Sequence, residues 1–115
     1  MIFIIILLIL LFKTGIKPKV IEEIRTFARK YNIDKVILFG SRARGDYRRT
    51  SDIDLAVVGG DFARFALDVD EETSTLLEYD IVDMGREMQD ELRQSIMREG
   101  KILYEKVWEF LFGFM

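Results

Sequence analysis

Two short runs of β-forming residues, separated by a polar segment, constrain the fold of this chain most strongly. Lys35–Phe39 and Ser51–Val58 are apolar runs rich in Val, Ile and Leu, and a glycine follows each of them. Runs of this length that end at glycine are typical of buried strands. The second run carries Asp52 and Asp54, and residues two apart in a strand point to the same face. We therefore predict a buried strand with two carboxylates side by side.

Helical patterns surround these two strands. Pro18 suits the first turn of a helix that should end near Asn32. A second helix is predicted over Asp61–Glu78, interrupted near Asp68–Asp70, and a third over Arg86–Glu99. Four apolar residues of the third helix are expected to face inward: Met88, Leu92, Ile96 and Met97.

The rest of the pattern completes a small sheet. Ser41–Gly45 is predicted to form a tight turn that opens into a short helical segment. Tyr79–Met84 should be a third strand, and Lys101–Tyr104 a short edge strand after Gly100, which suits the position just past a helix. The order helix–strand–strand–helix–strand–helix predicts an α/β (α+β) fold, a small mixed β-sheet packed by helices.

Composition excludes several kinds of chemistry. The 115 residues include no cysteine and no histidine, which excludes disulfides, thiolate nucleophiles and histidine bases. Any metal must therefore be held by oxygen, which points to magnesium, calcium or manganese. The net charge of −3 argues against direct binding to nucleic acid, which needs a strong basic surface.

The charges are distributed unevenly along the chain. Residues 42–49 include four arginines and one aspartate, whereas residues 61–83 include eight acidic residues and one arginine. A basic patch beside an acidic one suits a metal–polyphosphate complex better than a nucleic-acid track.

The first twelve residues, Met1–Phe12, are all apolar. This segment is too short to span a membrane as a helix, and it has neither the basic start nor the cleavage site of a signal peptide. An incorrectly assigned start codon, a disordered tail and a segment that pairs with a partner remain open as explanations. We expect membrane contact through residues 1–12 to be absent and the protein to be cytoplasmic. The predicted domains are an apolar extension (1–17), a catalytic domain (18–105) and an apolar tail (106–115) that could form an interface.

Asp52 and Asp54 are the strongest chemical signal in the sequence. Two ionised carboxylates side by side repel each other, and unpaired charges in a buried strand are costly. A magnesium ion, which prefers a few carboxylates together with water and phosphate oxygens, would resolve the conflict. A pair of such ions about 4 Å apart can activate a hydroxyl and stabilise a leaving group. The alternative is a solvent-facing acid pair on an edge strand.

Gly40 and Ser41 directly follow the first strand. A glycine lets the backbone approach a ligand closely, and the amides of the next turn, with the Ser41 hydroxyl, can hold a phosphate. Arg42 and Arg44 could add charge-assisted contacts to a polyphosphate. The alternative is a plain turn. The Gly40-Ser41 pair gains its significance from its position, because ten residues separate Ser41 from Asp52.

A third acid should come from the third predicted strand. Asp80 and Asp83 lie on opposite faces of that strand because side chains alternate. Asp80 could serve as a metal ligand or take the proton from an attacking hydroxyl. Asp83 is the other candidate for this third acid, and the register of the strand determines which of the two joins Asp52 and Asp54.

The segment Leu38–Gly45, continued by Ser51–Leu55, resembles the signature of the DNA polymerase beta-like nucleotidyltransferase superfamily, and of its minimal nucleotidyltransferase (MNT) family in particular. The resemblance covers roughly Pro18 to Glu105. It implies the polymerase beta-like palm fold. It also implies transfer of a nucleoside monophosphate, AMP from ATP above all, to a hydroxyl with release of pyrophosphate.

The resemblance also implies roles for individual residues and a partner. Gly40 and Ser41 would contact the nucleotide phosphates, Asp52 and Asp54 would bind magnesium, with manganese as an alternative, and Asp80 would complete the triad. MNT proteins commonly act as MntA-type antitoxins that add AMP to a tyrosine of a helical HEPN toxin. The resemblance thus implies a nucleoside triphosphate and a HEPN-like toxin as partners, in a homo- or hetero-oligomer.

Two other functions stay open at this point. The chain could neutralise a partner by masking it without catalysis, or it could transfer a nucleotide to a small molecule such as an aminoglycoside. Small-molecule enzymes of this superfamily usually carry an extra substrate domain, for which this chain has little room.

Overall fold

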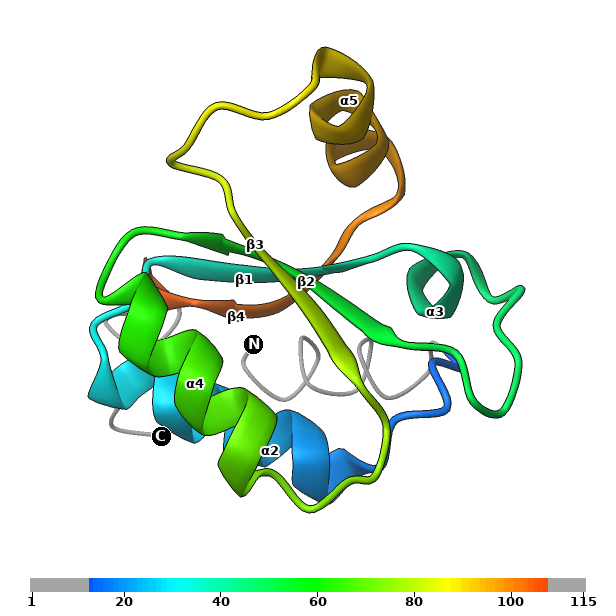
Figure 1. Cartoon of the computed structure of the whole chain (residues 1–115), viewed down its shortest axis with the longest axis horizontal. Helices are drawn as coiled ribbons and strands as arrows, with labels where there is room; N and C mark the ends of the chain where they lie inside the picture. The colour runs from blue at the N-terminus through cyan, green and yellow to red at the C-terminus, as the bar shows by residue number, and fades with distance from the viewer. Residues whose placement is uncertain (1–12, 108–115) are drawn as a thin grey trace.

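The structure, a computed structural model, describes residues 13–107, and in this range helices and strands alternate around one sheet (Figure 1). The elements in chain order are α2 (Pro18–Lys30), β1 (Lys35–Phe39), α3 (Ser41–Arg44), β2 (Ile53–Val58), α4 (Phe62–Glu72), β3 (Tyr79–Asp83), α5 (Asp90–Glu99) and β4 (Lys101–Glu105). The predictions for Met1–Phe12 and for residues 108–115 of the tail lie outside the described residues.

The four strands form a mixed sheet in the order β3-β2-β1-β4. β1 pairs antiparallel with β2 and with β4, whereas β2 and β3 run parallel. The predicted small mixed sheet packed by helices is thereby confirmed, with β2 in the interior of the sheet and β4 at an edge.

Helices α2 and α4 cover one face of the sheet, and α5 stands over the other (Figure 1). Alternation along β2 separates the two faces: Ile53, Leu55 and Val57 join the core under α2 and α4, while Ala56 joins the smaller cluster under α5. Asp54, which lies between Ile53 and Leu55, therefore emerges on the α5 face.

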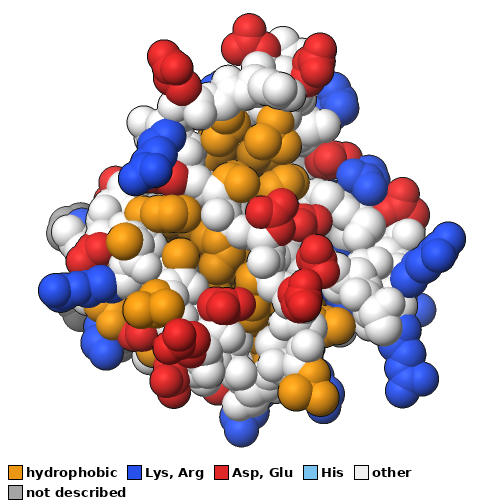
Figure 2. All heavy atoms as spheres, in the orientation of Figure 1, with side chains coloured by type: hydrophobic (Ala, Val, Ile, Leu, Met, Phe, Trp, Pro, Cys, Tyr) orange, Lys and Arg blue, Asp and Glu red, His pale blue; other side chains and the backbone are white. Residues whose placement is uncertain are grey.

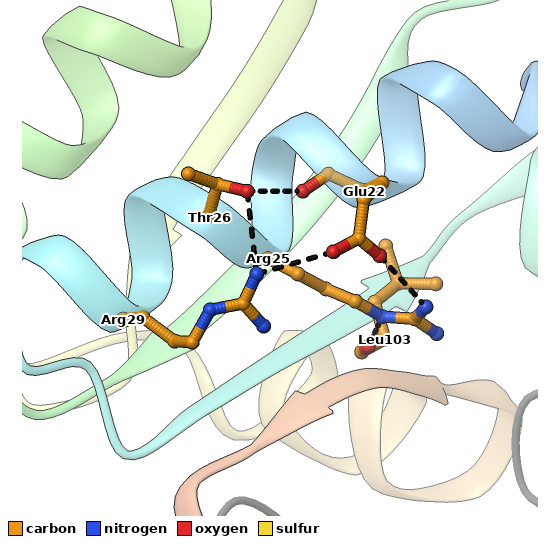
Figure 3. Close-up of polar contacts among 5 residues, drawn as sticks. All are labelled: Glu22, Arg25, Thr26, Arg29 and Leu103. Atoms are coloured by element: carbon orange, nitrogen blue, oxygen red, sulfur yellow. Dashed lines mark hydrogen bonds and ion pairs between the residues drawn. The ribbon is translucent and has the colours of Figure 1, made fainter. Parts of the chain in front are cut away.

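Polar contacts along α2 tie this helix to the edge strand β4 (Figure 3). Arg25 Nε donates a hydrogen bond of 2.8 Å to the carbonyl oxygen of Leu103 in β4. Glu22 accepts from Arg29 at 3.1 Å and lies 3.5 Å from Arg25. These contacts lie on the side of the sheet away from Asp54.

Helix α4 is continuous, so the predicted interruption near Asp68–Asp70 is wrong. Val69 is fully buried between these acids, and Asp68 accepts a hydrogen bond from the hydroxyl of Tyr31 on α2. The acids therefore lie on the outer side or pair across the helices, which leaves the helix intact.

Helix α5 is shorter than predicted because a turn follows β3. Asp83 accepts from the amide of Gly85 at 2.9 Å through its side chain, and the helix begins only at Asp90. Met97, which we expected to face inward, is 72% exposed, while Ile96 is 1% exposed.

Gly100 ends α5 with an extended backbone (φ −65°, ψ 146°) rather than a left-handed one. A side chain there would meet the Ile96 carbonyl oxygen at 2.4 Å and Ile37 at 2.5 Å. Close packing, not backbone conformation, therefore explains the glycine. Within residues 13–107, every helix is too short or too polar to cross a membrane.

Candidate active site

Three strands bring the predicted site residues to one end of the sheet. β2 and β3 begin there, and β1, which runs antiparallel to β2, ends there. Gly40 and Ser41 follow the end of β1. Asp52 immediately precedes β2, Asp54 lies in its first part, and Asp80 lies near the start of β3.

Asp54 lies between two neighbours on adjacent strands. It pairs with Phe39, the last residue of β1, on one side and with Asp80 on the other. Residues paired in register lie on the same face of a sheet. Asp54 and Asp80 therefore both face the side of the sheet that α5 covers in part.

Gly40 lies directly against Asp54. Its backbone has φ 73° and ψ −156°, a conformation that is essentially restricted to glycine. A Cβ at this position would lie 2.1 Å from Asp54 Oδ2. The glycine therefore permits both the sharp turn into α3 and the close approach of the backbone to the carboxylate.

Burial is the largest cause that raises the pKa of Asp54 from its ordinary value of 3.8 to about 6. The negative charges of Asp80 and then Asp52 raise the pKa further, while the positive charges of Arg44 and Arg42 lower it. Both acids are thus close enough to Asp54 to repel its charge. Perturbation of this kind is typical of functional sites.

Asp52 is exposed and precedes β2, so the prediction that it lies inside the strand is wrong. The ladder between β1 and β2 ends at the pair of Phe39 with Asp54, because Gly40 turns the chain away. The amide of Ile53 still donates 2.8 Å to the carbonyl oxygen of Glu78. Asp52 is therefore held at the edge of the ordered strand.

The register of β3 places Asp80 and Asp83, the two candidates for the third acid, at different distances along β2. Asp80 pairs with Asp54, whereas Asp83 pairs with Val57, three residues further along. The Asp83 carboxylate accepts from the Gly85 amide and lies 3.7 Å from Arg86 Nε. This geometry places Asp80 beside Asp54 and gives Asp83 a local role in the turn.

Ser41 begins α3, and the amides of residues 43 and 44 donate to the carbonyl oxygen of Gly40 at 3.1 and 3.0 Å. Arg44 extends from the same short helix and is bonded to Asp46 and Glu99, both at 3.2 Å. Its charge acts on Asp54, so it lies within electrostatic reach of the acids. Arg44 can thus attract an anion to this end of the sheet.

Arg42 is buried and does not contribute to the surface of the site. Its side chain is 2% exposed, and its guanidinium donates to the backbone carbonyl oxygens of Thr14, Arg49 and Ser51. The expected contact between Arg42 and a nucleotide therefore receives no support from this arrangement. Nothing in the sequence alone distinguishes it from Arg44.

The described residues hold no group of three or more acids that is arranged to bind a metal as it stands. The donor chemistry nevertheless fits a hard cation, because the site gathers carboxylates whose charges repel. Magnesium commonly binds to one or two carboxylates together with phosphate oxygens and water. Asp52, Asp54 and Asp80 can supply such ligands.

The surface around the acids is open and partly hydrophobic. Figure 2 shows acidic side chains over the β2–β3 part of the sheet, next to hydrophobic side chains that continue below α5. The partly buried residues of that surface are Val82, Met84, Met88 and Leu92. A cavity of about 580 Å³ lies elsewhere, between the start of α2 and the loop after α4, and none of the site acids lines it.

Comparison with known proteins places the chain in a family. The polymerase beta nucleotidyltransferase family matches residues 22–108, which is more than half of the chain. The chain belongs to this family. A protein of Methanocaldococcus jannaschii, named as a candidate protein adenylyltransferase, is 37% identical to this nucleotidyltransferase over 100 residues, which cover 76% of this chain and 98% of that protein.

Solved structures place this nucleotidyltransferase among the MNT proteins. A toxin–antitoxin with AMP-PNP is similar with a TM-score of 0.61 and 27% identity, over 74% of this chain and 73% of that one. A toxin–antitoxin MntA complex with a tyrosine-to-alanine mutation has a TM-score of 0.57 and 26% identity, over 73% and 71% of the chains. The predicted polymerase beta-like fold and MNT membership are thereby confirmed.

Proposed function

We propose that this protein transfers AMP from ATP to a hydroxyl of a partner protein, and that it acts as the antitoxin of a toxin–antitoxin pair. The observation that carries the proposal is the meeting of Gly40, Asp54 and Asp80 at one end of the sheet. The arrangement joins a backbone turn that can approach a phosphate to a cluster of carboxylates.

Each group has a distinct part in this proposal. The turn at Gly40 and the Ser41 hydroxyl would contact the triphosphate, with Arg44 adding positive charge. Asp52 and Asp54 would hold magnesium, which when bound neutralises phosphate charge and favours the ionised hydroxyl. Asp80, in register with Asp54, would accept the proton of the attacking hydroxyl.

The nature of the acceptor is supported by the relatives. The Methanocaldococcus protein is named as a candidate protein adenylyltransferase, and the structure with AMP-PNP is that of a toxin–antitoxin. We infer that the acceptor is a toxin protein, with a tyrosine of a HEPN-like toxin as the proposed target. The open surface beside the acids (Figure 2) leaves space for a macromolecular acceptor.

Incubation with ATP labelled at the α-phosphate, magnesium and a candidate HEPN-like toxin tests the proposal. We expect label on the toxin with wild-type protein, and none with Asp52→Asn or Asp54→Asn. Equal labelling by the variants would rule out this site. Full neutralisation of the toxin by an Asp52/Asp54 double variant would show instead that binding alone suffices.

A further inference from the structure

The buried guanidinium of Arg42 donates to the backbone carbonyl oxygens of Thr14, Arg49 and Ser51. We call this set of hydrogen bonds the Arg42 clasp. Two of its nitrogens donate to the same carbonyl oxygen of Ser51, Nε at 3.0 Å and Nη2 at 2.9 Å. Nη1 donates 2.8 Å to Thr14, and Nη2 also lies 3.3 Å from the Arg49 carbonyl oxygen. Burying a cation is costly unless its hydrogen bonds are satisfied, and here backbone oxygens satisfy them.

Aromatic and backbone packing hold the guanidinium in place. The ring of Tyr47, in the loop that leads to Asp52, lies with its centroid 4.9 Å from Arg42 Cζ. Gly15 lies against both groups, since a Cβ there would lie 2.5 Å from Nη1 of Arg42 and 2.6 Å from Cε2 of Tyr47. The clasp thus joins the start of the described chain, the loop of residues 46–51 and the short helix α3.

The clasp fixes Asp52 from one side while the sheet fixes it from the other. Ser51, immediately before Asp52, is bound by Arg42. Ile53, immediately after it, donates to the carbonyl oxygen of Glu78, the residue before β3. Asp52 itself is exposed and outside the strand. Its position relative to Asp54 therefore depends on these two neighbours.

We propose that Arg42 is a positioning residue that holds Asp52 beside Asp54 through the Ser51 carbonyl. This role rests on the proposed function, because it assigns Asp52 to the metal site. Arg42 also directly follows Ser41, so one short helix both offers the phosphate-binding turn and fixes the acid across the ten-residue spacer. Lysine cannot replace it, because an ammonium lacks the planar fork that reaches three separate carbonyls.

The test compares Arg42→Lys with Arg25→Lys. Arg25 also donates to a backbone carbonyl, that of Leu103 (Figure 3), but on the face of the sheet away from the acids. Binding of Mn²⁺ without nucleotide, measured by electron paramagnetic resonance, should weaken about 10- to 100-fold in Arg42→Lys. It should stay within twofold of wild type in Arg25→Lys. Amide exchange at residues 51–53 should accelerate only in Arg42→Lys.

Unchanged Mn²⁺ affinity in folded Arg42→Lys, or an equal loss in Arg25→Lys, would overturn the role of the clasp. If Arg42→Lys does not fold, Gly15→Ala, which crowds Nη1 of the guanidinium, takes its place with the same expected weakening. If the wild-type chain binds Mn²⁺ but transfers no nucleotide, the proposed function fails while the effect of Arg42→Lys on Mn²⁺ still tests the clasp.

Discussion

Replacement of Gly40 by alanine should disable nucleotide transfer while leaving the protein folded. The added Cβ would lie 2.1 Å from Asp54 Oδ2, so the carboxylate oxygen must withdraw by about 1.3 Å to reach an ordinary contact of 3.4 Å. A displacement of about 1 Å in a catalytic group can cost roughly 100-fold in rate. We therefore expect transfer to fall at least about 100-fold.

The same substitution should also cost stability. An alanine in the backbone conformation of Gly40 is strained by about 1–3 kcal/mol. For a domain of this size each kcal/mol lowers the melting temperature by roughly 4–8 °C. Transfer is therefore to be assayed as initial rates at 25 °C, after circular dichroism has shown that the variant is folded.

Gly59→Ala provides a matched control. Gly59 has φ +76°, and a Cβ there would lie 2.1 Å from Asp34 Oδ2, at the opposite end of β2 from the site. We expect this variant to be destabilised without a comparable loss of transfer. If Gly59→Ala loses as much activity as Gly40→Ala, or if Gly40→Ala transfers at the wild-type rate, the close approach of Gly40 to Asp54 is not required for transfer.

Three further predictions concern the acids and the arginine around them. Because the folded-state pKa of Asp54, about 6, lies above its ordinary value of 3.8, metal-free stability should fall as the pH rises between these values. Chemical denaturation should show that Asp54→Asn removes this fall and is more stable than wild type at pH 7; a variant with the wild-type pH slope would contradict this. Asp80→Asn should slow single-turnover transfer about 10²- to 10⁴-fold, whereas Asp83→Asn should transfer at nearly the wild-type rate, and the reverse order would assign the role to Asp83. Arg44→Gln should weaken ATP binding in calorimetry about tenfold, as loss of a charge-assisted contact does, and unchanged affinity would exclude that contact.

The sequence predicted the strands well because local composition determines them. Lys35–Phe39 and the apolar part of Ser51–Val58 form β1 and β2, since β-branched residues pack well in a buried sheet. Helix boundaries were less predictable. Helix α5 begins only after a turn in which the Asp83 carboxylate accepts from the Gly85 amide. In α4, Asp68 is bonded to Tyr31 on α2, a contact between helices that local periodicity does not reveal.

The candidate site, like the fold, could be predicted from the sequence only in part. Gly40 and Asp54 could be placed from spacing alone, and their contact follows once β1 pairs with β2. That Asp80 rather than Asp83 lies beside Asp54 follows from the parallel register of β3, which no local pattern encodes. Arg42 and Arg44 are two residues apart in a basic run, and only the folded chain shows that one is buried and the other exposed.

In the proposed reaction, Asp54 and its neighbours attach a nucleotide to a hydroxyl of a partner protein. Intact-mass and peptide mass spectrometry of the toxin, co-expressed with wild-type protein or with Asp54→Asn, measures this directly. We expect AMP on a hydroxyl side chain of the toxin with wild-type protein and unmodified toxin with the variant. Neutralised but unmodified toxin in both cases would contradict it.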